Sequence, residues 1–111
     1  MSLSADIYAE LQRADTARIA GNEGRVRVCA RRAAGMAARD FLKRHDKYPS
    51  SSKRNLSSYE AIQELAAFPT LSPELRQAAV HLTMPVNSEF HLPPGIDLIF
   101  EADKLIRGLI E

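Results

Sequence analysis

The sequence lacks the features on which several large classes of protein depend. Its 111 residues include one cysteine, Cys29, which can form neither an internal disulfide nor a cysteine-based zinc site. Its longest stretch without a charged side chain, 77–88, has 12 residues and contains a proline, which is too short to span a bilayer. The first 18 residues alternate acidic and basic side chains, unlike a secretory signal or a transit peptide. We therefore expect a cytoplasmic protein that does not enter a membrane.

An excess of charge of one sign is also missing. Lys and Arg number 15 against 14 Asp and Glu, which gives a formal net charge of +1. Apolar residues make up 45% of the chain and charged residues 26%, proportions typical of a globular protein rather than a disordered one. At this length we expect one domain over 1–111.

Proline is absent from the first 48 residues, and five of the six prolines lie beyond residue 68. Because proline breaks helix interiors, the first half can hold long helices and the second half requires short ones. Apolar spacing predicts helices over about 4–20 and 22–45. The glycines and Asn22 of the 21–24 break suit the end of one helix and the start of the next.

Cap residues mark the start of two of the three shorter helices. Ser57 and Glu60 have the spacing of a capping box, and Ser72 precedes a proline suited to the first helical turn. A last amphipathic helix follows the Pro-Pro-Gly segment at 93–95. No segment shows sustained apolar and polar alternation, so we expect an all-α bundle of four or five helices. A short extended stretch packed on this bundle is expected at three apolar positions: Val86, Phe90 and Leu92.

One face of the second helix is dominated by alanine. A period of 100° per residue places small and apolar side chains together on it. The face comprises Val26, Cys29, Ala30, Ala33, Met36, Ala37 and Phe41. It predicts close approach by another helix, either from the same bundle or from a dimer partner. Cys29 is expected to act there as a small apolar residue.

A basic stripe runs along the flank of the same helix, within an arc of roughly 40°. It consists of Arg25, Arg32, Arg39 and Lys43. Residues 1–54 carry a net charge of +6 and residues 55–111 a net charge of −5. The stripe is a candidate nucleic-acid-binding surface, because clustered cations attract phosphates. It can equally pack beside the acidic last helix or form a solvated face.

Motifs for metals and cofactors are missing. The three histidines, His45, His81 and His91, show none of the His–Glu or His–His spacings of di-iron bundles or zinc proteases. The chain also has no phosphate-binding loop of the Gly-x4-Gly-Lys type. We therefore expect no metal and no cofactor.

Two arginine–histidine spacings remain as candidates for chemistry. Arg76 lies five residues before His81, and Arg39 lies six residues before His45. Histidine can move a proton near neutral pH, and arginine can hold a phosphate, which suffices for metal-free attack of an RNA 2′-hydroxyl on its own phosphate. On a regular helix, however, the first pair is about 140° apart and the second about 120°. A bend, a helix end or a second subunit is needed, or else His81 merely ends a short helix and Arg76 is solvated.

Two segments resemble those of a known family. Residues 7–42 contain a helix, a Gly-Asn-x-Gly turn and the alanine-rich stretch RVRVCARRAAGMAARDFL, and residues 76–87 read RQAAVHLTMPVN. This layout resembles the HEPN (higher eukaryotes and prokaryotes nucleotide-binding) domains, which are small α-helical bundles. The resemblance implies a homodimer in which two Arg/His sets share one cleft. Many HEPN members are metal-independent ribonucleases, often toxins of toxin–antitoxin systems, while others are non-catalytic and some work beside a nucleotidyltransferase.

Carried over by position, the resemblance makes Arg76 the phosphate-holding residue and His81 the proton-transfer residue. Gln77 stands where the family usually has Asn or Asp, and Thr83 stands where a tyrosine is common. These departures bear on catalysis and leave the fold untouched. Two functions follow as hypotheses: a domain that binds or cleaves RNA or binds a nucleotide, and a non-catalytic module that binds a nucleotidyltransferase or another protein.

Overall fold

The computed structural model describes residues 3–45, 56–84 and 95–110, and in these segments it contains five helices and no strands. The helices are α1 (Leu3–Ile19), α2 (Glu23–Arg44), α3 (Ser58–Ala66), α4 (Pro73–Leu82) and α5 (Leu98–Ile110). The all-α prediction is therefore confirmed for the described residues. The positions of the expected extended stretch, Val86, Phe90 and Leu92, lie outside them. None of the described helices is long and apolar enough to cross a membrane.

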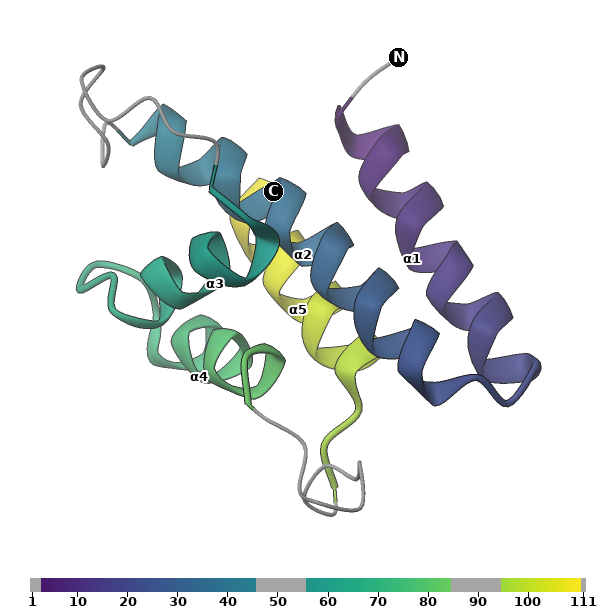
Figure 1. Cartoon of the computed structure of the whole chain (residues 1–111). Helices are drawn as coiled ribbons and strands as arrows, with labels where there is room; N and C mark the ends of the chain where they lie inside the picture. Colours follow the sequence, from purple (N-terminus) through teal and green to yellow (C-terminus); the bar gives the residue numbers. More distant parts are fainter. Residues whose placement is uncertain (1–2, 46–55, 85–94, 111) are drawn as a thin grey trace.

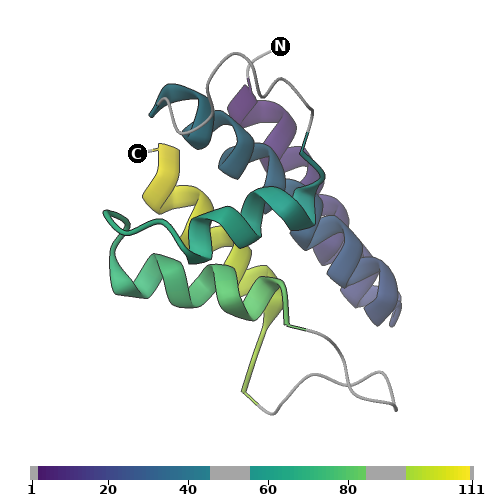
Figure 2. The same cartoon turned by 60° about the vertical axis from the view of Figure 1, so that its left-hand side comes forward.

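Helix α2 is the central element of the bundle. It runs antiparallel to α1 and packs on α3 and α5 as well, while α4 lies against α3 and α5 (Figures 1 and 2). Because α2 has neighbours on three sides, its buried surface is wider than the single stripe that its apolar spacing predicts. Ala34, Gly35, Ala38 and Leu42 are buried in addition to the alanine-rich face, whereas Met36 is only half-buried.

The turn between α1 and α2 follows from two residues. Gly21 has a φ of 77°, a conformation that favours glycine, and its N–H bonds to the Arg18 carbonyl. The N–H of Asn22 reaches back to the Ala17 carbonyl, which completes a glycine-terminated helix end. The Asn22 side chain then accepts a hydrogen bond from the N–H of Arg25 and begins α2. The predicted break is confirmed.

The shorter helices begin at the predicted caps. Ser57 and Glu60 form both hydrogen bonds of a capping box, at 3.0 and 2.9 Å, and the Ser72 hydroxyl accepts from Leu75 N–H. The cap of α5 was not expected from the sequence. There Asp97 accepts hydrogen bonds from the N–H groups of Ile99 and Phe100.

The alanine-rich face of α2 lies inside the bundle. Ala30, Ala33 and Ala37 have no exposed surface, because α1, α3 and α5 cover them. At the crossing with α3 the backbones are so close that a β-carbon on Gly35 would lie 2.4 Å from the Cβ atom of Ser58. Small side chains thus let α2 serve as the centre of the fold, and this face is not open to a dimer partner.

Candidate functional site

His81 lies near the end of α4, half-buried against α5. Its Nε2 atom is 2.9 Å from the side-chain amide nitrogen of Gln77, one turn earlier on the same helix. Its Nδ1 atom is buried and lies 3.3 Å from Oε1 of Glu101 on α5. The second contact is long and is not aligned as a hydrogen bond. The two ring nitrogens therefore face different polar partners.

Glu101 is the residue of this site that was not expected from the sequence. It is only 6% exposed, although the neighbours on its helix face are Leu98, Ala102 and Leu105. Lys104 Nζ lies 3.7 Å from the same Oε1 atom that faces His81. Glu101 lies three residues after Leu98 and four before Leu105, a spacing that places it on the apolar face of α5. This spacing is the feature of the sequence that could have indicated a buried carboxylate.

Arg76 occupies a different side of α4 from His81. It is half-buried, and its Nε atom is buried without a hydrogen-bond partner. Among the described residues no hydrogen bond or ion pair joins Arg76 to His81, in agreement with the angle of about 140° between them on a regular helix. The chain by itself thus brings His81 to Glu101 and leaves Arg76 apart.

The second arginine–histidine pair makes structural contacts. Arg39 donates a hydrogen bond to the Leu56 carbonyl, which fixes the approach to α3. His45 follows the last residue of α2, where its Nδ1 atom lies 2.9 Å from the Phe41 carbonyl. Its ring stacks on that of Phe41, with centroids 4.0 Å apart. These contacts explain both residues without a role in chemistry.

The predicted basic stripe is divided between paired and exposed side chains. Arg32 forms an ion pair with the buried Glu10 of α1 at 3.1 Å, and Arg39 is bound to a backbone carbonyl. Arg25 and Lys43, near the two ends of α2, are exposed. The contacts of Arg32 and Arg39 are thus with α1 and with the segment before α3, not with the acidic last helix.

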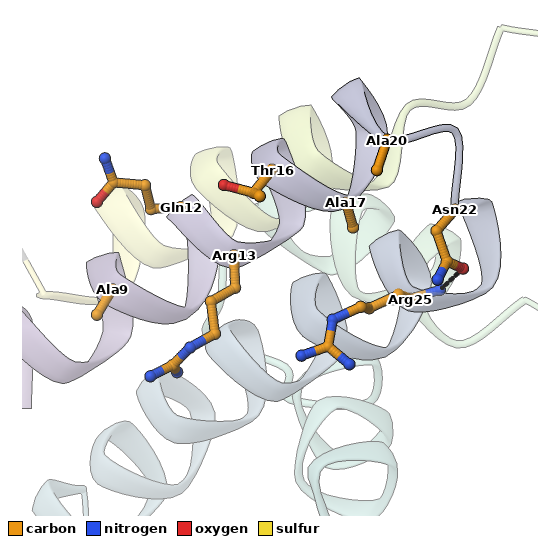
Figure 3. Close-up of a pocket in the computed structure, with 8 residues that line it drawn as sticks. All are labelled: Ala9, Gln12, Arg13, Thr16, Ala17, Ala20, Asn22 and Arg25. Carbon is orange, nitrogen blue, oxygen red and sulfur yellow. Dashed lines mark hydrogen bonds between the residues drawn. The ribbon is translucent and has the colours of Figure 1, made fainter.

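A groove of about 450 Å³ lies between α1 and the start of α2 (Figure 3). Its lining combines small side chains, amides and two guanidinium groups: Ala9, Gln12, Arg13, Thr16, Ala17, Ala20, Asn22 and Arg25. Arg13 and Arg25 extend on the same side of the helix pair in this view. Arg13 is held there by an ion pair with Glu10 at 2.6 Å. Arg25 is the stripe residue that borders this groove.

Glu10 lies beside Cys29 in the interface between α1 and α2. Burial raises the pKa of Glu10, but hydrogen bonds from Cys29 and Arg13 and the charge of Arg32 lower it by more, so the net shift is downward. Burial, followed by the hydrogen bond to Glu10, raises the pKa of the Cys29 thiol. A buried thiol beside a carboxylate is a poor nucleophile. This environment fits the expected packing role of Cys29.

Arg31 fixes the end of α4 that carries His81. Its Nε atom donates to the Leu82 carbonyl at 2.5 Å and its Nη2 atom to the Met84 carbonyl at 3.2 Å. Leu82 is the last residue of α4, where carbonyl groups have no partner within the helix, and Met84 lies two residues beyond it. Arg31 thereby ties α2 to the turn of α4 next to His81, a role with no signal in the sequence.

The described residues contain no group of three or more His, Cys, Asp or Glu side chains able to hold a metal ion. Comparisons of the chain with protein-family models, with curated proteins and with solved structures find no match. Arguments about function therefore rest on the residues themselves.

Proposed function

We propose that this chain is a HEPN-like domain that binds RNA or a nucleotide phosphate and acts as a metal-independent ribonuclease of the toxin type. His81 is its proton-transfer residue and Arg76 its phosphate-holding residue. The observation that carries the proposal is the contact of 3.3 Å between His81 Nδ1 and the buried carboxylate of Glu101. A buried carboxylate behind an imidazole is a common way to orient a histidine for proton transfer.

The reaction requires few groups. His81 accepts the proton of an RNA 2′-hydroxyl, whose oxygen attacks the adjacent phosphorus, and the 5′-oxygen of the next nucleotide leaves. The products are a 2′,3′-cyclic phosphate and a 5′-hydroxyl end. A guanidinium group stabilises the charge that develops on the phosphate oxygens. The protonated His81 or a water molecule then donates a proton to the leaving 5′-oxygen, so that the step balances.

A homodimer belongs to this proposal because Arg76 and His81 do not meet within one chain. In the dimer that the resemblance to HEPN domains implies, Arg76 of one copy would hold the phosphate beside His81 of the other. Analytical ultracentrifugation of the chain at micromolar concentration tests whether it forms this homodimer. Detection of monomers alone would refute the dimer.

Cleavage in the presence of a chelator tests the proposed activity. Purified chain is incubated with single-stranded RNA in excess EDTA beside two variants, His81→Ala and His45→Ala. The second variant is a matched control, because it removes a histidine whose contacts are with Phe41. We expect His81→Ala to lower the rate by about 100-fold or more, as for loss of a general acid or base, and His45→Ala to retain it. Equal rates for wild type and His81→Ala would refute the assignment.

The exposed ends of the basic stripe are the proposed path for the phosphate backbone. Replacement of Arg25 and Lys43 by Gln should weaken RNA binding and reduce its dependence on salt, because fewer counterions are released. Arg107→Gln is a control for loss of positive charge on α5, where that residue pairs with Asp103. A salt dependence that is the same in all three proteins would make the stripe a solvated face.

A non-catalytic interaction module is the second candidate function, with a nucleotidyltransferase or another protein as its partner. Two exposed apolar side chains favour it: Val80 on α4 is 40% exposed and Phe100 on α5 is 60% exposed. Each is the chain neighbour of a residue in the His81–Glu101 contact. Absence of cleavage together with loss of partner binding in Phe100→Ser would favour this function over the ribonuclease.

A further inference from the structure

The two nitrogens of His81 have partners of opposite character. Nε2 lies 2.9 Å from the side-chain nitrogen of Gln77, a group that can only donate a hydrogen bond. Nδ1 lies 3.3 Å from a carboxylate oxygen of Glu101, a group that accepts when ionised. A neutral imidazole has one N–H and one lone pair, so these partners distinguish its two tautomers.

With Glu101 ionised, only one tautomer is compatible with both contacts. With the proton on Nδ1, Nε2 accepts a hydrogen bond from Gln77, and the Nδ1–H group lies 3.3 Å from the carboxylate oxygen, a favourable electrostatic contact although the two are not aligned as a hydrogen bond. With the proton on Nε2, two N–H groups would face each other at Gln77, and the Nδ1 lone pair would face a carboxylate oxygen in a buried setting. Repulsion is strong there, because little water screens it.

Rotation of the Gln77 amide does not rescue the second tautomer. It would place the amide oxygen opposite an Nε2–H group and repair that contact. The Nδ1 lone pair would still face Oε1 of Glu101, and neither of these buried atoms has a hydrogen-bond partner in the described part of the chain. Glu101 is therefore the partner that decides the tautomer, and Gln77 adapts to it.

We infer that Glu101 is a positioning residue that holds neutral His81 with its proton on Nδ1, so that Nε2 is the nitrogen able to accept a proton. The Gln77 amide covers Nε2 until a hydroxyl group replaces it. The assignment of the tautomer stands on the contacts alone. Its consequence, that Nε2 takes the proton of the RNA hydroxyl, rests on the proposed function.

Nuclear magnetic resonance tests the tautomer directly. Imidazole ¹⁵N–¹H correlation spectra are recorded on the ¹⁵N-labelled chain at a pH where histidine is neutral, and His81 is assigned by its loss in His81→Asn. We expect a protonated Nδ1 and an unprotonated Nε2. A wild-type His81 protonated mainly on Nε2 would overturn the inference, whatever the variants do.

Three variants identify the residue that sets the tautomer. Glu101→Leu should make the Nε2–H form the major one, because the free imidazole prefers it and the carboxylate is gone. Gln77→Ala should keep the Nδ1–H form. Asp103→Asn, which removes a carboxylate that pairs with Arg107 on the same helix, is the matched control and should leave the spectrum unchanged. A switch in Gln77→Ala but not in Glu101→Leu would overturn the role of Glu101.

Kinetics separate this inference from the proposed function. Because Glu101 lies behind the imidazole, Glu101→Leu should lower kcat by about tenfold or more and leave KM for RNA unchanged. An inactive wild-type chain with His81 protonated on Nδ1 would refute the ribonuclease and keep the tautomer. An active chain with His81 protonated on Nε2 would keep the ribonuclease and refute Glu101 as its positioning residue.

Discussion

Gly35 controls how closely α3 approaches the centre of the bundle. A β-carbon at this position would lie 2.4 Å from the Cβ and Oγ atoms of Ser58 and 2.6 Å from its Cα atom. Rotation of the Ser58 side chain can relieve the contact with Oγ but not the contacts with Cβ and the backbone. Since non-bonded carbons settle at about 3.5–4.0 Å, Gly35→Ala must displace the start of α3 by roughly 1 Å.

Two opposing effects set the size of the change. Overpacking in a close-packed core costs about 1–3 kcal/mol, whereas replacement of glycine by alanine inside a helix contributes about 0.8–1 kcal/mol in favour of folding. We therefore expect Gly35→Ala to lower the free energy of unfolding by up to about 2 kcal/mol. For a chain of this size the melting temperature should fall by up to roughly 10 °C.

Two other glycines supply matched controls for urea and thermal unfolding. A β-carbon on Gly108 would lie 2.5 and 2.7 Å from the two methyl carbons of Leu75 and 3.1 Å from its Cγ atom, all in a side chain that can rotate, and one on Gly24 would meet nothing closer than 3.8 Å. We expect Gly24→Ala to be at least as stable as wild type, Gly108→Ala to be close to it and Gly35→Ala to be the least stable. A Gly35→Ala protein as stable as Gly24→Ala would refute the reasoning about the α2–α3 contact.

Three further predictions concern the α1–α2 and α2–α4 contacts. Because the folded-state pKa of Glu10 is lowered, its ionised form stabilises the fold above its ordinary value of 4.5, and this stability is lost as the pH falls through the lower folded value. In urea unfolding, the free energy of unfolding should fall less steeply with decreasing pH in Glu10→Gln than in the wild type. The same dependence on pH in both proteins would contradict this prediction. Arg31→Met should lower the free energy of unfolding by about 1–3 kcal/mol, because it removes the side-chain donor of the Leu82 carbonyl at the end of α4 and of the Met84 carbonyl just beyond it, and an unchanged urea midpoint would disprove this. Cys29, buried and with a raised pKa, should react with a maleimide far more slowly in the native chain than in urea, whereas equal rates would show an accessible thiol.

The helices could be predicted because the signals that begin and end them are local. Ser57 with Glu60, Ser72 and the Gly21–Asn22 turn act within a few residues of the helix ends, and each appears in the structure where the sequence places it. Asp97 has the same chemistry as those caps, and α5 follows the 93–95 segment as the sequence predicts, but Asp97 itself was not identified as the cap. Its ion pair with Arg18, 79 residues away, has no local signal.

The candidate site was predictable only in its local part. The contact between Gln77 and His81 spans four residues of one helix, a spacing that faces side chains toward each other. The contact between His81 and Glu101 depends on how far α4 and α5 slide along one another, and no short motif sets that register. Apolar periodicity does indicate that Glu101 points inward, as it does for Glu10 on α1. It does not indicate that His81 of α4 is the side chain that Glu101 contacts.

The two inward glutamates differ in how completely their charge is compensated. Glu10 pairs with Arg13 and Arg32, whereas Oε1 of Glu101 has no hydrogen bond and lies 3.3 Å or more from its ionic partners. A buried carboxylate stabilises a fold only when well bonded. We therefore expect Glu10→Gln to cost about 1–3 kcal/mol of unfolding free energy at neutral pH and Glu101→Gln to cost less than about 1 kcal/mol. Equal losses in urea unfolding would mean that Glu101 is retained for stability. The expected difference would mean that Glu101 contributes little to stability and that its place beside His81 serves the site, as in proteins where function is kept at the expense of stability.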